Sequence, residues 1–107
     1  GWDLFQDLLK VLRTVADRHD ATIGQVAVRW VHSRPMVAAA IVGATSTRHL
    51  DENVRIFDLT LTDQDYADIE AVRSKRQGPE GDCYDLERDK TGRHGSIMKY
   101  NLNDDRD

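Results

Sequence analysis

The feature that most constrains this chain is an unbroken apolar run that ends at a glycine. The run consists of Met36, Val37, Ala38, Ala39, Ala40, Ile41 and Val42. An apolar run without alternation is typical of a strand that is covered on both faces, as in a parallel sheet packed between helices. Gly43, which follows the run, permits a sharp turn. We therefore expect one short, buried β-strand over residues 36–42.

The residues after the glycine have the pattern of a turn that leads into a helix. Residues 45–47 carry hydroxyl groups and are candidate N-caps. Leu50, Val54 and Phe57 recur at helical spacing, so this helix has an apolar face. Free amides in the first turn, with the cation of Arg48 beside them, predict an anion site suited to phosphate. An ordinary capped junction between strand and helix explains the same residue types.

A longer pattern around this stretch resembles the C-terminal segment of the aldo-keto reductases. It comprises VADRHDATIGQVAVRWVHSRP (15–35), IVGATSTRHLDEN (41–53) and DQDYADIEAV (63–72). The resemblance implies a (β/α)8 TIM barrel whose last strand and following helix hold the 2′-phosphate of NADP(H). A barrel needs roughly 250 residues, whereas this chain has 107. The resemblance therefore implies about the last quarter of a barrel, mainly α with one short β-strand.

The resemblance also implies which residues contact the cofactor. Carried over position by position, they are Gly43, Ala44, Thr45, Ser46, Arg48, His49, Glu52 and Asn53. The family often has Lys at Gly43, Ser at Ala44 and Arg at His49, so the chain departs from the pattern at three places. Arg48 offers a planar donor fork that suits a phosphate. We expect binding of NADP(H), a nicotinamide dinucleotide, that is weak in the isolated chain and not strictly selective for the 2′-phosphate.

The family's chemistry is hydride transfer from the nicotinamide to a carbonyl, with a Tyr as general acid and Asp, Lys and His in support. Those four residues lie on earlier strands of the barrel, which this chain lacks. Tyr66, Tyr84 and Tyr100 do not occur in the matching context. We therefore assign no catalytic residue and expect the isolated chain to be inactive.

The remaining elements follow from periodicity and capping. Residues 2–19 form an amphipathic pattern of helical spacing. Thr22 and Gln25 form a capping box for a second helix, which Pro35 stops. Thr62 caps a last helix that ends by residue 75. Together these patterns predict, over residues 2–76, a segment with the order helix, helix, strand, helix and helix.

The part from residue 77 onward is predicted to be an extended tail, 77–107. Glycines recur there and apolar residues are sparse. By resemblance, this segment crosses the barrel mouth and helps to shape the substrate pocket; a disordered terminus is the alternative. The residues that would pack there are Tyr84, Leu86, Ile97, Met98 and Tyr100.

Other classes of function receive little support from the sequence. The His residues and Cys83 show no metal-ligand spacing, and no apolar run is long enough to cross a membrane. A lone cysteine fits a reducing compartment, which predicts a cytoplasmic location. The first two helices loosely resemble a helix-turn-helix DNA reader with Gln25, Arg29 and His32 exposed. The net charge of −4 opposes nucleic-acid binding, so the rival is a stand-alone helical interaction module without enzymatic activity.

A single strand among helices has no neighbouring strand with which to form hydrogen bonds. Its amides and carbonyls would be unpaired, at a cost of about 1–3 kcal/mol each when shielded from water. Pairing with the same strand of a second copy satisfies them. We therefore expect a homodimer joined through residues 36–42, unless the segment packs as a loop or helix in a monomer.

Overall fold

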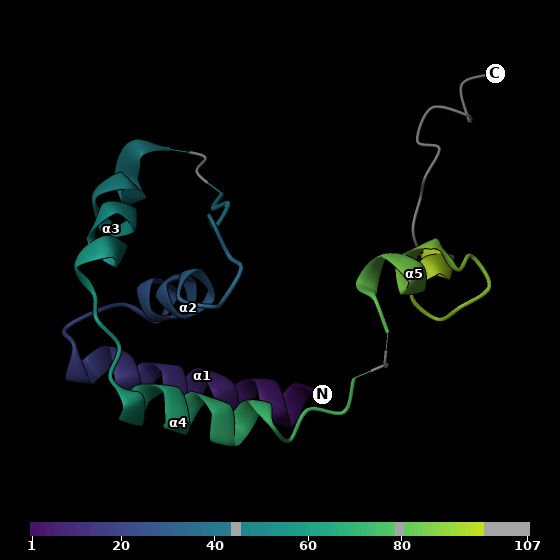
Figure 1. The fold of residues 1–107 in the computed structure, drawn as a ribbon, viewed down its shortest axis with the longest axis horizontal. Helices are drawn as coiled ribbons and strands as arrows, with labels where there is room; N and C mark the ends of the chain where they lie inside the picture. The colour runs from purple at the N-terminus through teal and green to yellow at the C-terminus, as the bar shows by residue number, and fades with distance from the viewer. Residues whose placement is uncertain (44–45, 79–80, 98–107) are drawn as a thin grey trace. The chain divides into compact units, whose positions relative to one another are not determined.

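The computed structural model describes residues 1–43, 46–78 and 81–97. The chain divides into two compact units, residues 1–77 and 78–107. The described residues form helices and irregular segments, and they contain no β-strand (Figure 1). The prediction of a mainly helical chain is confirmed.

The first unit is built on α1 (Trp2–Arg18), whose apolar stripe faces α2 and α4. Val15 and Ala16 are fully buried, whereas Phe5 is half exposed. The helix ends at Arg18, and Asp20, two residues further on, has a positive φ of 50°. The amide of Ala21 donates to the Ala16 carbonyl at 2.9 Å, the long bond of a Schellman-type end. Amphipathic spacing and this C-terminal turn together explain the predicted helix over 2–19.

Helix α2 (Ile23–His32) begins with the predicted capping box. The Gln25 amide donates to the Thr22 hydroxyl at 3.1 Å, and the Thr22 amide donates to the Gln25 side-chain oxygen at 2.9 Å. The helix ends before Pro35, as predicted. Val26 is fully buried, but the apolar side chain of Val31 is 43% exposed. The local signals therefore fix the ends of α2 more reliably than they fix its buried face.

The predicted strand over residues 36–42 is wrong. Residues 37–43 have no regular structure, and Met36 adopts a positive φ of 69°. A strand requires a neighbouring strand to receive its hydrogen bonds, and no described segment offers one. Figure 1 shows this irregular segment running from the end of α2 toward α3. Apolar composition alone therefore does not make residues 36–42 a strand.

The predicted helix after residue 43 is present but broken into three short pieces. They are η1 (Thr47–His49), α3 (Leu50–Val54) and η2 (Arg55–Asp58). Ser46 occupies the N-cap position of η1, but its side chain makes no capping hydrogen bond. With so few consecutive α-helical peptides, the dipole at this helix start is weak.

Helix α4 (Asp63–Arg73) completes the core of the first unit. It lies beside α1 in Figure 1, and its predicted cap at Thr62 is present. Ile69 and Val72 are buried on its inner face. The core cluster consists of Leu12, Val15, Ala16, Val26, Leu59, Leu61 and Ile69. It joins three helices and the segment that leads into α4.

The second unit holds α5 (Cys83–Arg88) and the single turn η3 (Gly95–Ile97). Asp82 caps α5, because its carboxylate accepts a hydrogen bond from the Tyr84 amide at 2.8 Å. These two short elements lie in the segment for which we expected an extended tail. Tyr84 and Ile97 are exposed within this unit. Met98 and Tyr100, two of the predicted pocket residues, lie outside the described residues.

Candidate functional site

The candidate cofactor residues that the structure describes lie on the surface, from Gly43 to α3. Gly43, Ser46 and Arg48 are exposed, and so are His49 and Glu52. Asn53 is partly buried on α3. Ala44 and Thr45, the remaining two candidates, lie outside the described residues. The segment therefore presents polar and cationic groups to solvent, next to the irregular 37–43 segment.

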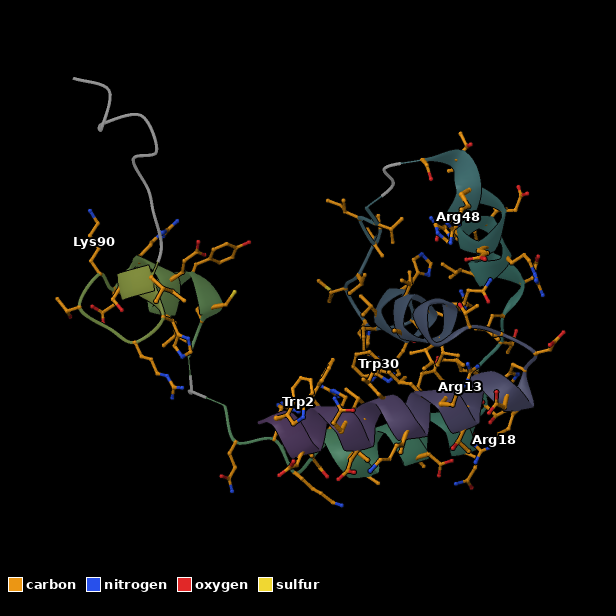
Figure 2. The ribbon with its side chains drawn as sticks, turned by 180° about the vertical axis from the view of Figure 1, so that it is seen from behind. Trp2, Arg13, Arg18, Trp30, Arg48 and Lys90 are labelled. Carbon is orange, nitrogen blue, oxygen red and sulfur yellow. The ribbon has the colours of Figure 1, made fainter. Side chains whose placement is uncertain are left out.

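Arg48 is the cation of this surface, and Figure 2 labels it near the start of the η1 and α3 segment. No described residue forms an ion pair or hydrogen bond with its guanidinium. The hydroxyl of Ser46 also makes no cap bond. These donors are thus free to bind an external anion such as a phosphate.

His49 does not act as a free cation here, because it pairs with Glu52. Nδ1 of His49 lies 3.0 Å from a carboxylate oxygen of Glu52, and both side chains are about half exposed. Since a carboxylate only accepts hydrogen bonds, Nδ1 carries the proton in this contact. A ligand that uses either side chain must compete with this exposed pair, whose strength is small.

Gln25 links this surface to the core, a contact that sequence reasoning missed. Its amide nitrogen donates to the backbone carbonyl of Glu52 at 2.8 Å, while its oxygen serves the Thr22 cap. The side chain is buried, although we expected it to be exposed. The side-chain nitrogen of a capping-box Gln is not used by the cap, and this is the only sequence signal for such a link. Because Gln25 is buried, α2 cannot use it to read DNA.

An apolar groove lies beside the same surface, with a volume of about 550 Å³. Asn53 and His32 are the polar groups in its lining. The other lining residues are Val28, Ala38, Ala39, Ala40, Val42, Leu50, Val54, Ile56 and Phe57. The apolar face predicted for the helix after residue 46 therefore lines an open groove.

The most perturbed carboxylate lies elsewhere, at Asp65 on α4. Its side chain is buried and receives hydrogen bonds from the Thr62 amide and hydroxyl, the His19 ring and the Arg18 guanidinium. Burial alone raises the pKa of the Asp65 carboxyl, but these donors outweigh it and hold the pKa well below its usual range. All of the partners are structural, so this perturbation marks a junction of helices and does not indicate catalysis.

Comparison with known protein families identifies the chain. The model of the Aldo/keto reductase family matches residues 2–74, which include α1 to α4 and the candidate cofactor surface. The chain belongs to the aldo/keto reductase family. Proteins of this family use NAD(P)H, so a cofactor-facing surface is expected somewhere in a complete member.

Individual relatives are distant and much longer. The chain is 26% identical to aldo-keto reductase str7 of Strobilurus tenacellus over 73 residues, which are 68% of this chain and 22% of that protein. It is 31% identical to aldose reductase B of Dictyostelium discoideum over 70 residues, 64% of this chain and 22% of that protein. The identity to the NAD(P)H-dependent 6′-deoxychalcone synthase of Glycine max is 29% over 66 residues, 62% of this chain and 20% of that protein.

The chain thus spans about a fifth of the length of these aldo/keto reductases. No solved structure matches it. Among the described residues, no three His, Cys, Asp or Glu side chains are grouped to hold a metal ion. None of the described helices is long and apolar enough to cross a membrane.

Proposed function

We propose that this chain supplies the adenosine-phosphate-binding part of an NADP(H) site, as the C-terminal portion of an aldo/keto reductase barrel. The observation that carries the proposal is the guanidinium of Arg48, which pairs with no described residue and lies in a surface segment inside the family match. A planar, always charged fork suits the oxygens of a phosphate monoester. The proposed contacts are Gly43, Ala44, Thr45, Ser46, Arg48, His49, Glu52 and Asn53.

The described residues fit this group. Arg48 and Ser46 provide unpaired donors, and Asn53 offers an amide beside an apolar wall that suits a planar base. When bound, the nicotinamide of the cofactor supplies a hydride for carbonyl reduction. The chain's own residues would bind and orient only the adenosine end. Because no catalytic residue is assigned, we propose that reduction requires further parts of a barrel.

The test is titration calorimetry with adenosine 2′,5′-bisphosphate and with AMP as ligands. Arg48→Ala should weaken binding of the bisphosphate by about 1.5–3 kcal/mol, the usual worth of a hydrogen bond to a charged group. Binding of AMP, which lacks the 2′-phosphate, should change little. Equal affinities of wild type and Arg48→Ala for the bisphosphate would contradict the proposal.

Arg55→Ala is the matched control, because Arg55 is an exposed arginine of the next turn, outside the proposed contacts. It removes the same charge from the same region. A generic electrostatic effect would weaken binding equally in both variants and would fall with salt. A specific phosphate contact affects Arg48→Ala alone.

Two further expectations remain predictions. One is the division of the chain into a barrel segment (2–76) and a tail (77–107). A cytoplasmic location rests on the single Cys83.

A further inference from the structure

Gln25 makes two hydrogen bonds from one buried side chain, and each bond serves a different element of the first unit. Its oxygen accepts from the Thr22 amide and completes the cap of α2. Its nitrogen donates to the Glu52 carbonyl of α3 at 2.8 Å, across 27 positions of the sequence. Because Gln25 is only 6% exposed, water does not readily replace either bond.

Helix α3 has few other contacts that fix its position. It is five residues long and contains no buried residue. Within the described residues, the bond from Gln25 is the one hydrogen bond that joins α3 to α2. The next burial along the chain is Ile56 in η2. Since so short a helix is not stable by itself, a bond of this kind decides where it lies.

The residues on and before α3 are those of the proposed phosphate surface. Gln25 holds Glu52 by its backbone carbonyl, and the carboxylate of Glu52 lies 3.0 Å from Nδ1 of His49. Asn53 follows in the same helix, and Arg48 lies in η1, which leads directly into it. Two successive hydrogen bonds therefore connect the buried side of α2 to a side chain of that surface.

We propose that Gln25 is a positioning residue, which holds α3 on α2 and so keeps the proposed phosphate contacts in place. The inference rests on the proposed function for its ligand, whereas the hold on α3 is a property of the fold. Gln25 acts through Glu52 and does not itself touch the ligand, because it is buried. If α3 leaves its position for part of the time, the apparent affinity falls with the fraction of chains that keep it.

Two substitutions remove the link in different ways. Gln25→Met adds no charge but has no group that can replace either hydrogen bond. Gln25→Glu keeps an oxygen for the cap, since Glu also forms capping boxes, but its carboxylate cannot donate to the Glu52 carbonyl. Thr22→Ala is the matched control, because it removes the cap hydroxyl and leaves the bond from Gln25 to Glu52 intact.

Two measurements on the full chain follow, after circular dichroism has shown which variants are folded. The first is hydrogen exchange of the α3 amides by NMR, relative to the amides of α4. The second is titration calorimetry with adenosine 2′,5′-bisphosphate. In both Gln25 variants, α3 should exchange about fivefold faster and the bisphosphate should bind about fivefold more weakly, the equivalent of one hydrogen bond. Thr22→Ala should leave both quantities unchanged, although it lowers the stability of the chain.

The two Gln25 variants check each other. If Gln25→Met does not fold, Gln25→Glu gives the same comparison with the cap retained. If both fold, an effect shared by the neutral and the charged variant cannot come from the added charge.

Two results would overturn the inference. Wild-type exchange in α3 and wild-type affinity in the Gln25 variants would show that other contacts hold α3. An equal effect of Thr22→Ala would assign the loss to the cap of α2. A wild-type chain that does not bind the bisphosphate would instead contradict the proposed function, and the exchange rates of α3 would still decide whether Gln25 holds this helix.

Discussion

At the scale of single residues, Asp65 combines full burial with a retained negative charge. The cost of burying a carboxylate is offset only because Arg18, His19 and Thr62 all donate to it. Asp65→Asn removes the charge while keeping the size. We expect the free energy of unfolding to fall by about 1.5–3 kcal/mol, as measured by urea denaturation.

Asp63→Asn controls for a general effect of charge at the start of α4. Asp63 lies in the same first turn, but it is exposed. Surface substitutions of this kind change stability by about 0.5 kcal/mol or less. If Asp63→Asn and Asp65→Asn lower the free energy of unfolding equally, the charge of Asp65 stabilises the fold only by its position at the start of α4.

At the scale of elements, the same carboxylate joins α1 to α4. Arg18 bridges two side chains of α4, with its guanidinium 2.9 Å from Asp65 and 2.8 Å from Asp68. Figure 2 labels Arg18 near the end of α1. The pKa of Asp68 is lowered first by a hydrogen bond from Gln64 and then by the one from Arg18. The pKa of Arg18 is raised, mainly by its hydrogen bond to Asp68. The charged forms of all three groups therefore favour the folded state.

This junction predicts acid sensitivity. The pKa of Asp65 is lower in the folded chain than in the unfolded chain. Its contribution is thus complete well above the unfolded value of about 3.9 and is lost as the pH falls toward the folded value. The free energy of unfolding should decline from about pH 5 downward. In Asp65→Asn this decline should be shallower, and identical pH profiles would contradict the assignment.

At the scale of the whole molecule, the buried core that stabilises the fold lies in the first compact unit. Every member of the core cluster lies before residue 77. A chain shortened to residues 1–77 should therefore fold, and its free energy of unfolding should stay within about 1 kcal/mol of the full chain. Urea denaturation followed by circular dichroism measures both. Loss of cooperative unfolding in the shortened chain would show that residues 78–107 are required for folding.

The small core limits the stability of the first unit. Domains of this length bury only about 60% of the surface of their unfolded chain, so their stability is marginal. Exposed apolar side chains such as Met36, Ile41 and Phe57 leave further apolar area in contact with water.

The sequence by itself determined the features that depend on neighbours along the chain. The capping box at Thr22, the cap at Thr62 and the end of α2 before Pro35 are local, because each involves residues a few positions apart. The family pattern was also readable, since it extends over the residues of four helices. These features need no tertiary contact to be recognised.

Only the tertiary structure decided the features that depend on distant partners. Residues 36–42 have the composition of a buried strand, yet a strand forms only where another strand accepts its hydrogen bonds. Gln25 is buried because Glu52, 27 positions away, offers a carbonyl. Asp65 meets Arg18 across 47 positions and His19 across 46. The periodicity of a sequence predicts which face of a helix a residue occupies. Contacts between residues so far apart in the sequence depend on how the helices pack.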